Sequence, residues 1–159
     1  MFAMLCIFLF LSSSCLVHGK SNETHFWLYT RHNLDDYENM EFDGTDISLT
    51  EDSLFDSRKP TKVVAHGWGG GLHIDKIFAQ AYAAGGLDYN VIGIDWREME
   101  GSAKQQVVAV GIHAAHFIEV LVRDHGLLLQ DVHAIGFSYG AHVVGKLGHF
   151  SISYQSGPT

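Results

Sequence analysis

Val132-His133-Ala134-Ile135-Gly136-Phe137 leads directly into Ser138-Tyr139-Gly140. The apolar run predicts a buried strand, and a helix is expected after it over residues 141–147. Ser138 therefore falls on a sharp strand-to-helix turn, where a serine hydroxyl stands above a sheet and faces a helix N-terminus that stabilises negative charge. Gly136 and Gly140 remove the side chains that would collide with neighbouring backbone at such a turn. We interpret Ser138 as a candidate nucleophile, and the alternative is an ordinary turn serine.

The rest of the sequence alternates short apolar runs with helical patterns. Strands are expected over residues 26–30, 62–65 and 89–96, with a short edge strand around 46–50, and helices over 74–84 and 102–125. This alternation predicts the α/β class, with a mostly parallel sheet covered by helices on both faces. The polar residues 151–159 are expected to form a loop. The domain over residues 20–159 is therefore expected to be partial and truncated after the helix that follows Ser138.

A second glycine-rich turn, His66-Gly67-Trp68-Gly69-Gly70, follows the strand expected over residues 62–65. Acyl transfer passes through a tetrahedral oxyanion that needs preorganised N–H donors. In α/β-hydrolases one donor is the residue after the nucleophile, here Tyr139, and the other lies on a loop after an earlier strand, where the N–H of Trp68 fits. His66 and Gly67 are expected to shape this loop. The alternative is a phosphate-binding loop, but Leu72 breaks the G-x-G-x-x-G pattern.

Several other polar and aromatic residues have plainer interpretations. Asp95 ends a strand, but in this fold class the catalytic acid follows the nucleophile in the chain, so Asp95 is expected to be structural. Trp68 and Trp96 can either line an acyl pocket or pack in the core. Three residues at three-residue steps on one expected helix have the wrong spacing for a metal site: His113, His116 and Glu119. The sequence therefore predicts neither a metal nor a cofactor.

The net charge argues against one class of partner, and the N-terminal residues indicate a cellular compartment. The formal net charge is −8, from 18 acidic and 10 basic residues, which disfavours binding to nucleic acid but not to a neutral lipid surface. Residues 1–19 are apolar and predict a signal peptide that is removed on secretion, leaving no stable membrane span, with a transmembrane anchor as the alternative. Cys6 and Cys15 both lie in this segment, so no disulfide is expected after it. Asn22 begins an N-glycosylation sequon.

Four stretches of this sequence resemble the pancreatic-lipase family of animal neutral lipases, in the branch found in insects and other arthropods. They occur in the family's order and spacing: Phe26-Trp27-Leu28-Tyr29-Thr30, Pro60-Thr61-Lys62-Val63-Val64-Ala65-His66-Gly67-Trp68, Tyr89-Asn90-Val91-Ile92-Gly93-Ile94-Asp95-Trp96 and Asp131-Val132-His133-Ala134-Ile135-Gly136-Phe137-Ser138-Tyr139-Gly140-Ala141-His142. Two positions depart from the pattern, because Phe137 stands where many members have His and Tyr139 where many have Leu.

The resemblance implies a secreted carboxylic-ester hydrolase that acts on triacylglycerols or phospholipids at a lipid–water interface. It implies Ser138 as the nucleophile and the N–H groups of Trp68 and Tyr139 as the oxyanion hole. The family's catalytic acid and histidine lie further along the chain than Thr159, so we expect a polypeptide of these residues alone to be weakly active or inactive. A phospholipase A1 of the same family is one alternative. The other is a non-catalytic lipid-binding or yolk-like storage protein on the same fold, a class that lacks the nucleophile.

Overall fold

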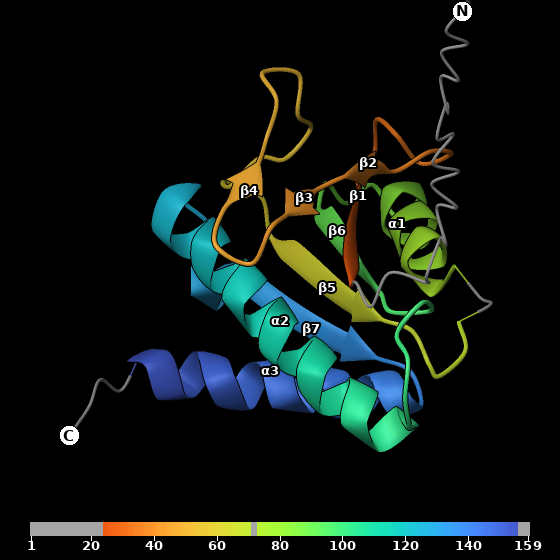
Figure 1. The fold of residues 1–159 in the computed structure, drawn as a ribbon. Helices are drawn as coiled ribbons and strands as arrows, with labels where there is room; N and C mark the ends of the chain where they lie inside the picture. The colour runs from red at the N-terminus through yellow and green to blue at the C-terminus, as the bar shows by residue number, and fades with distance from the viewer. Residues whose placement is uncertain (1–23, 71–72, 156–159) are drawn as a thin grey trace, which may run out of the picture.

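The computed structural model describes residues 24–70 and 73–155. The predicted signal peptide over residues 1–19, with its two cysteines, and the sequon at Asn22 lie outside the described residues. Within the described part of the chain, strands and helices alternate along the sequence from β5 onward, as Figure 1 shows. The predicted α/β class is confirmed.

A five-stranded mixed sheet runs through the middle of the molecule, in the order β2-β1-β6-β5-β7. Its three parallel strands are β5 (Thr61–Ala65), β6 (Asn90–Asp95) and β7 (Val132–Gly136), and all six residues of β6 are buried. β1 (His25–Tyr29) runs antiparallel to β6, and β2 (Glu38–Asn39) pairs with the outer side of β1. Because parallel strands end at the same edge, the segments after β5, β6 and β7 emerge next to one another, where ligands commonly bind in open α/β sheets.

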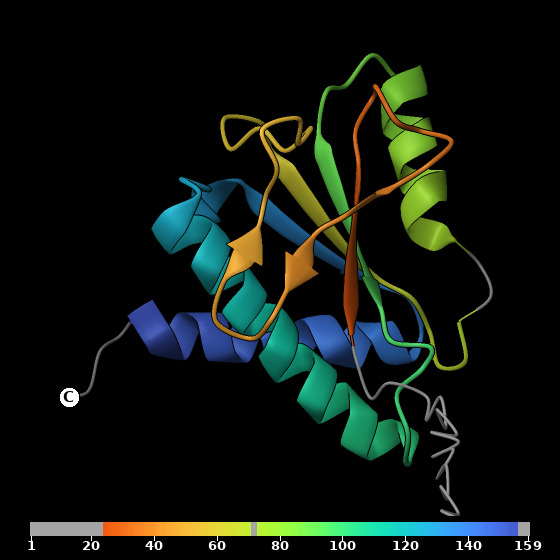
Figure 2. The ribbon, with the colours of Figure 1, turned by 45° about the horizontal axis from the view of Figure 1, so that its top comes forward.

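Helices cover both faces of this sheet. α1 (Ile74–Ala84) packs on one face, while α2 (Ala103–Asp124) and α3 (Tyr139–Gln155) lie on the other, as Figures 1 and 2 show. Alternate side chains of β1 pack into the hydrophobic clusters on the two faces of the sheet, as the two-residue period of a strand requires. Phe26 and Leu28 join the core under α2, whereas the next residues along, Trp27 and Tyr29, join the core under α1.

Local sequence explains where the long helix α2 begins and ends. Ser102 and Gln105 form a capping box at its N-terminus, and Gly126 follows its last turn with a φ of +75°. α2 is long and apolar enough to cross a bilayer, but 56% of its most apolar 18-residue window is buried inside the fold. Its apolar side therefore belongs to the core. A short 3-10 helix, η1 (Leu129–Asp131), then leads into β7.

Three details differ from the sequence-based expectations. α3 starts at Tyr139 and continues through residues 151–155, which were expected to be a loop. The prediction was wrong because the buried Val143 and Leu147 anchor this helix on α2, and the strong breakers Gly157-Pro158 come only after its end. The strand expected around residues 46–50 is β4 (Ile47–Ser48), and it pairs with β3 (Glu41–Phe42) in a separate two-stranded sheet.

Two helical glycines, one in α2 and one in α3, differ in the space around them and therefore give a matched pair of test substitutions. A Cβ added at Gly111 would lie 2.4 Å from Lys146 Cβ and 3.0 Å from the Val143 carbonyl, while one added at Gly145 meets nothing within 4 Å. We predict that Gly111→Ala lowers the free energy of unfolding by about 1–2 kcal/mol through overpacking, and that Gly145→Ala raises it by about 0.5–1 kcal/mol through helix propensity. Urea denaturation of both variants measures this, and changes of the same sign would contradict the helix packing described here.

Candidate active site

The turn between β7 and α3 forces its serine into an uncommon backbone conformation. Ser138 has a φ of +53°, and within residues 24–70 and 73–155 no other non-glycine residue has a positive φ. The N–H of Phe137 donates to the Ala65 carbonyl at 3.0 Å, and the N–H of Gly140 donates to the Phe137 carbonyl at 2.8 Å. A left-handed conformation costs a non-glycine residue of order 1–3 kcal/mol, so it persists only where surrounding contacts impose it.

The glycines on either side of Ser138 leave no room for a side chain. A Cβ at Gly140 would lie 2.2 Å from the Ala65 carbonyl oxygen, and one at Gly136 would lie 2.3 Å from the Gly140 carbonyl oxygen. Both distances are far below any real contact. The close approach of α3 to the ends of β5 and β7 therefore depends on these two positions.

The turn after β5 lies directly against this serine. The N–H of Gly70 donates to the Gly67 carbonyl at 3.2 Å, and Gly69 has a φ of +81°, the value that a type II turn requires at its third residue. Trp68 is the second residue of this turn. A Cβ built on Gly67 would lie only 3.3 Å from Ser138 Cβ. The two turns therefore face each other across the edge of the sheet where the parallel strands end.

A surface cleft of about 270 Å³ opens between the two turns. Ser138 is exposed in it, and Trp68 (60% exposed), Phe137 (53%) and Tyr139 (43%) give it an apolar rim. The complete lining is His66, Gly67, Trp68, Gly70, Ile74, Phe137, Ser138 and Tyr139. The cleft thus contains every candidate site residue from the sequence except Gly136 and Gly140, which lie behind it, and Asn22, which is outside the described residues.

His66 connects the cleft to the buried layer beneath it. Its Nδ1 lies 2.6 Å from the Gly67 carbonyl oxygen, and its Nε2 lies 3.0 Å from Asp95 Oδ1. The imidazole stacks on the indole of Trp96 with an interplanar angle of 7°, and the Trp96 side chain is buried in the core. The two tryptophans considered for an acyl pocket therefore differ, because Trp68 borders the cleft and Trp96 does not.

Asp95 is a buried carboxylate with several partners, as its structural interpretation anticipated. Arg97 Nε and Nη2 donate to its two oxygens at 2.8 and 2.9 Å. Burial alone would raise the pKa of Asp95, but the contacts with His66 and Arg97 outweigh burial and hold that pKa well below its usual range. Sequence reasoning missed Arg97, although the Asp-x-Arg spacing at the end of a buried strand was visible.

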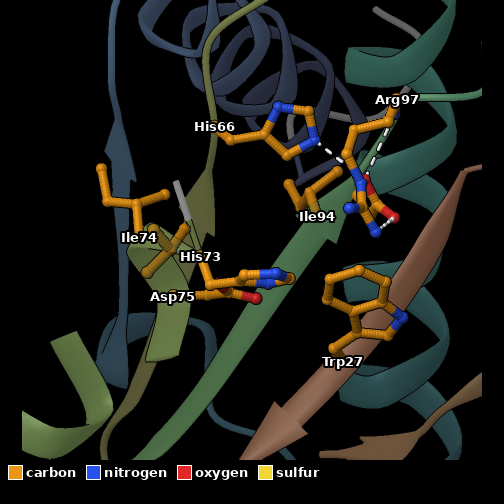
Figure 3. A pocket seen from close by; sticks show the side chains of 9 residues that line it. Trp27, His66, His73, Ile74, Asp75, Ile94 and Arg97 are labelled. Carbon is orange, nitrogen blue, oxygen red and sulfur yellow. Dashed lines mark hydrogen bonds and ion pairs between the residues drawn. The ribbon is translucent and has the colours of Figure 1, made fainter. Parts of the chain in front are cut away.

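A second buried carboxylate, Asp75, was also missed. It belongs to the first turn of α1 and is 6% exposed, and it packs against Gly93, where a Cβ would lie 2.1 Å from Asp75 Oδ2. Figure 3 shows Asp75 and His73 on one side of a small pocket and Trp27 and Arg97 on the other. Burial raises the pKa of Asp75, and the opposing hydrogen bond from the backbone of Lys76 only partly offsets it.

The histidines of α2 form no metal site. His113 faces the rings of Phe26 and Phe42, with ring centroids 5.7 and 4.9 Å away. Burial, followed by the nearby His116, lowers the pKa of His113. No cluster of three or more potential metal ligands occurs among the residues that the structure describes.

Comparisons with known proteins place the chain among lipases. A family model described as "Lipase" matches residues 13–154. Mouse pancreatic triacylglycerol lipase is 31% identical over 132 residues, which cover 79% of this chain and 27% of that protein. Mouse phospholipase A1 member A is 32% identical over 146 residues, covering 87% of this chain and 30% of that protein. Human pancreatic lipase-related protein 3 is 33% identical over 132 residues, covering 79% and 27%. The chain spans less than a third of the length of these relatives.

The raised pKa of Asp75 predicts the direction in which its contribution to the free energy of unfolding changes with pH. A folded-state pKa above the unfolded value means that the folded chain holds this proton more tightly, so the contribution of Asp75 to stability is present at low pH and is lost as pH rises through the raised value. Asp75→Asn removes this dependence. We therefore expect the difference in unfolding free energy, variant minus wild type, to increase from pH 3 to pH 7 in urea titrations. A difference independent of pH would contradict the burial of this carboxylate.

Proposed function

This chain belongs to the pancreatic-lipase family, and we propose that it supplies the nucleophile and the oxyanion hole of a serine hydrolase that cleaves carboxylic esters of lipids. The observation that carries the proposal is the conformation of Ser138. Its backbone is held at a φ of +53° between a strand and a helix, and its side chain borders the same cleft as Trp68 and Tyr139. Strain of this kind is typical of functional serines at such turns.

The proposed reaction is acyl transfer through Ser138. Its hydroxyl attacks the ester carbonyl as a general base takes its proton, and the tetrahedral intermediate then breaks its ester C–O bond and releases the alcohol, which receives that proton. The acyl-enzyme that remains is hydrolysed by water, which releases the fatty acid and regenerates the serine. The N–H groups of Trp68 and Tyr139 stabilise the oxyanion, and the N-terminus of α3 adds favourable potential. The family pattern places the acid and the histidine base beyond Thr159, so we propose that residues 20–159 form part of a larger catalytic domain. No metal or cofactor takes part in these steps.

The substrate class follows from the rim of the cleft and from the relatives. Three large exposed apolar side chains, Trp68, Phe137 and Tyr139, border Ser138 and suit an acyl chain at a lipid–water interface. One relative is named a triacylglycerol lipase and another a phospholipase A1, at nearly equal identity. We therefore propose a lipid ester as substrate, with both classes as candidates. Secretion, glycosylation at Asn22 and placement in the arthropod branch remain predictions.

The non-catalytic alternative, a lipid-binding or storage protein, fits the fold but not the serine. A binding protein would gain nothing from a strained, exposed serine flanked by two glycines that admit no Cβ. The cost of such a turn favours the hydrolase.

The proposal is tested by replacing the nucleophile with a titratable reporter. Residues 20–159 contain no cysteine, so Ser138→Cys introduces one thiol. A thiolate at a helix N-terminus that faces two N–H groups is stabilised, and we expect the thiol pKa of this variant to lie about one unit below the ordinary value of about 8.5. The pH dependence of iodoacetamide alkylation measures it. Ser48→Cys, at an exposed strand position, provides the control.

Adding Trp68→Pro to the Ser138→Cys variant isolates the contribution of the Trp68 backbone N–H to the thiol pKa. Proline lacks the N–H and is favoured at the second residue of a type II turn, while Trp68→Ala keeps the N–H and removes only the indole. We expect the proline variant to raise the thiol pKa and the alanine variant to leave it low. Equal pKa values at positions 138 and 48 would refute the oxyanion hole.

A further inference from the structure

The turn that carries the proposed donor Trp68 is held from two sides by one ion pair, Asp95 with Arg97. We propose that this pair is a positioning group, which aims the Trp68 N–H at the substrate carbonyl by fixing both ends of the Gly67–Gly70 turn. The inference rests on the function proposed above and extends it to two residues outside the cleft chemistry. Neither side chain is assigned contact with substrate, so neither is called catalytic.

The peptide that joins Gly67 to Trp68 is held through its carbonyl oxygen. Its carbonyl oxygen accepts the N–H of Gly70 at 3.2 Å and lies 2.6 Å from His66 Nδ1. A carbonyl oxygen can only accept, so Nδ1 carries a proton in this contact. The peptide is planar and trans, so its N–H points opposite to its C=O. Two donors that fix the Gly67 carbonyl therefore fix the direction of the Trp68 N–H as well.

The imidazole of His66 is held by contacts with Asp95 and Trp96. Its Nε2 lies 3.0 Å from Asp95 Oδ1, and an ionised carboxylate can only accept, so it is the doubly protonated ring that donates both to Gly67 and to Asp95. The backbone nitrogen of Trp96 lies 3.1 Å from Nε2 and donates to it only when Nε2 carries no proton. The Trp96 indole stacks on the imidazole, and Trp96 Nε1 donates to the His66 carbonyl at 3.1 Å. Rotation of the imidazole would break the contact with Asp95 and the contact with Gly67 together. The orientation of His66 therefore follows the position of the Asp95 carboxylate.

Arg97 lies against the other end of the turn, at Gly70. Arg97 binds both oxygens of Asp95, and its guanidinium lies 5.0 Å from the centroid of the Trp27 ring. Gly70 packs directly on the methylene stem, because a Cβ built on Gly70 would lie 2.2 Å from Arg97 Cγ and Cδ. Figure 3 shows His66 directed toward Arg97, with the Trp27 indole below the guanidinium. One side chain therefore orients Asp95 and also supports Gly70.

Loss of the guanidinium is expected to release the turn rather than only weaken the fold. The Asp95 side chain is 4% exposed and Arg97 is its cationic partner in a bidentate pair. A buried carboxylate that loses this partner either rotates toward water or retains an unfavourable charge. Rotation removes the Oδ1 contact of His66, so the effect passes to the Gly67 carbonyl and then to the Trp68 N–H.

Backbone ¹⁵N relaxation on residues 20–159 tests this inference, with Arg97→Met as the main variant. Methionine keeps part of the aliphatic stem and removes the fork of donors. We expect the order parameters of the Trp68 and Gly69 amides to fall from about 0.85 to below about 0.6, while the amides of α2 stay rigid. Arg97→Lys keeps the charge without bidentate geometry and should give an intermediate loss.

Arg58→Met is the matched control, because Asp56 and Arg58 form the same Asp-x-Arg fork, at 2.9 and 2.9 Å, away from the cleft. It should leave Trp68 and Gly69 unchanged. Rigid Trp68 and Gly69 amides in folded Arg97→Met would overturn the inference, even where the thiol pKa at position 138 upholds the proposed function. Unfolding of both Arg97 variants beside a folded Arg58→Met would also overturn it, because the pair would then serve global stability.

Discussion

The Ala65 carbonyl, at the end of β5, accepts the N–H of Phe137 and leaves space for Gly140 that no side chain could share. This contact between the ends of two neighbouring parallel strands sets the rest of the site. It brings the turn after β5 against the turn after β7, with Gly67 beside Ser138, and it imposes a left-handed backbone on a serine. The register that pairs Ala65 with Gly136 makes the two turns start at the same level of the sheet. Without it, the candidate nucleophile and the candidate donor would belong to separate loops.

Two layers of different polarity meet at this edge of the sheet, an apolar cleft and a charged group beneath it. The cleft itself is exposed and apolar at its rim, which suits a substrate that arrives from a lipid surface. Beneath it, the buried carboxylate of Asp95, with His66 and the partly exposed Arg97, supports the backbone of the cleft. Burying such a charge is stabilising only when its hydrogen bonds are nearly complete. The large core under α2, with aromatic stacking between Phe26 and Phe117, offsets these costs and the strain at Ser138. The hydrophobic core and the candidate site are therefore built on the same strands.

The long periodic elements and the two glycine-rich turns were predictable from the sequence, and the pieces held only by tertiary contacts were not. The helix over Ile74–Ala84 was predicted with its observed bounds, because a helix-forming run ends at a glycine pair. β2 and β3 have two residues each, too few for any periodicity to register. In the site, five cleft residues were identified from motifs, but Asp75 resembles an ordinary surface charge in the sequence, and the Asp-x-Arg spacing alone does not show what Arg97 contacts. The structure shows that Gly70 packs on the stem of Arg97, and that Asp75 is buried against Gly93.

The most direct measurement is a crystal structure of the larger catalytic domain proposed above, in which the base activates Ser138, with a phosphonate trapped on Ser138 to imitate the tetrahedral intermediate. The phosphoryl oxygen stands for the oxyanion, and we predict that it lies within about 2.7–3.1 Å of the backbone nitrogens of both Trp68 and Tyr139. A phosphoryl oxygen turned to solvent, or bound by only one of these nitrogens, would contradict the claim that the two turns together build one oxyanion site.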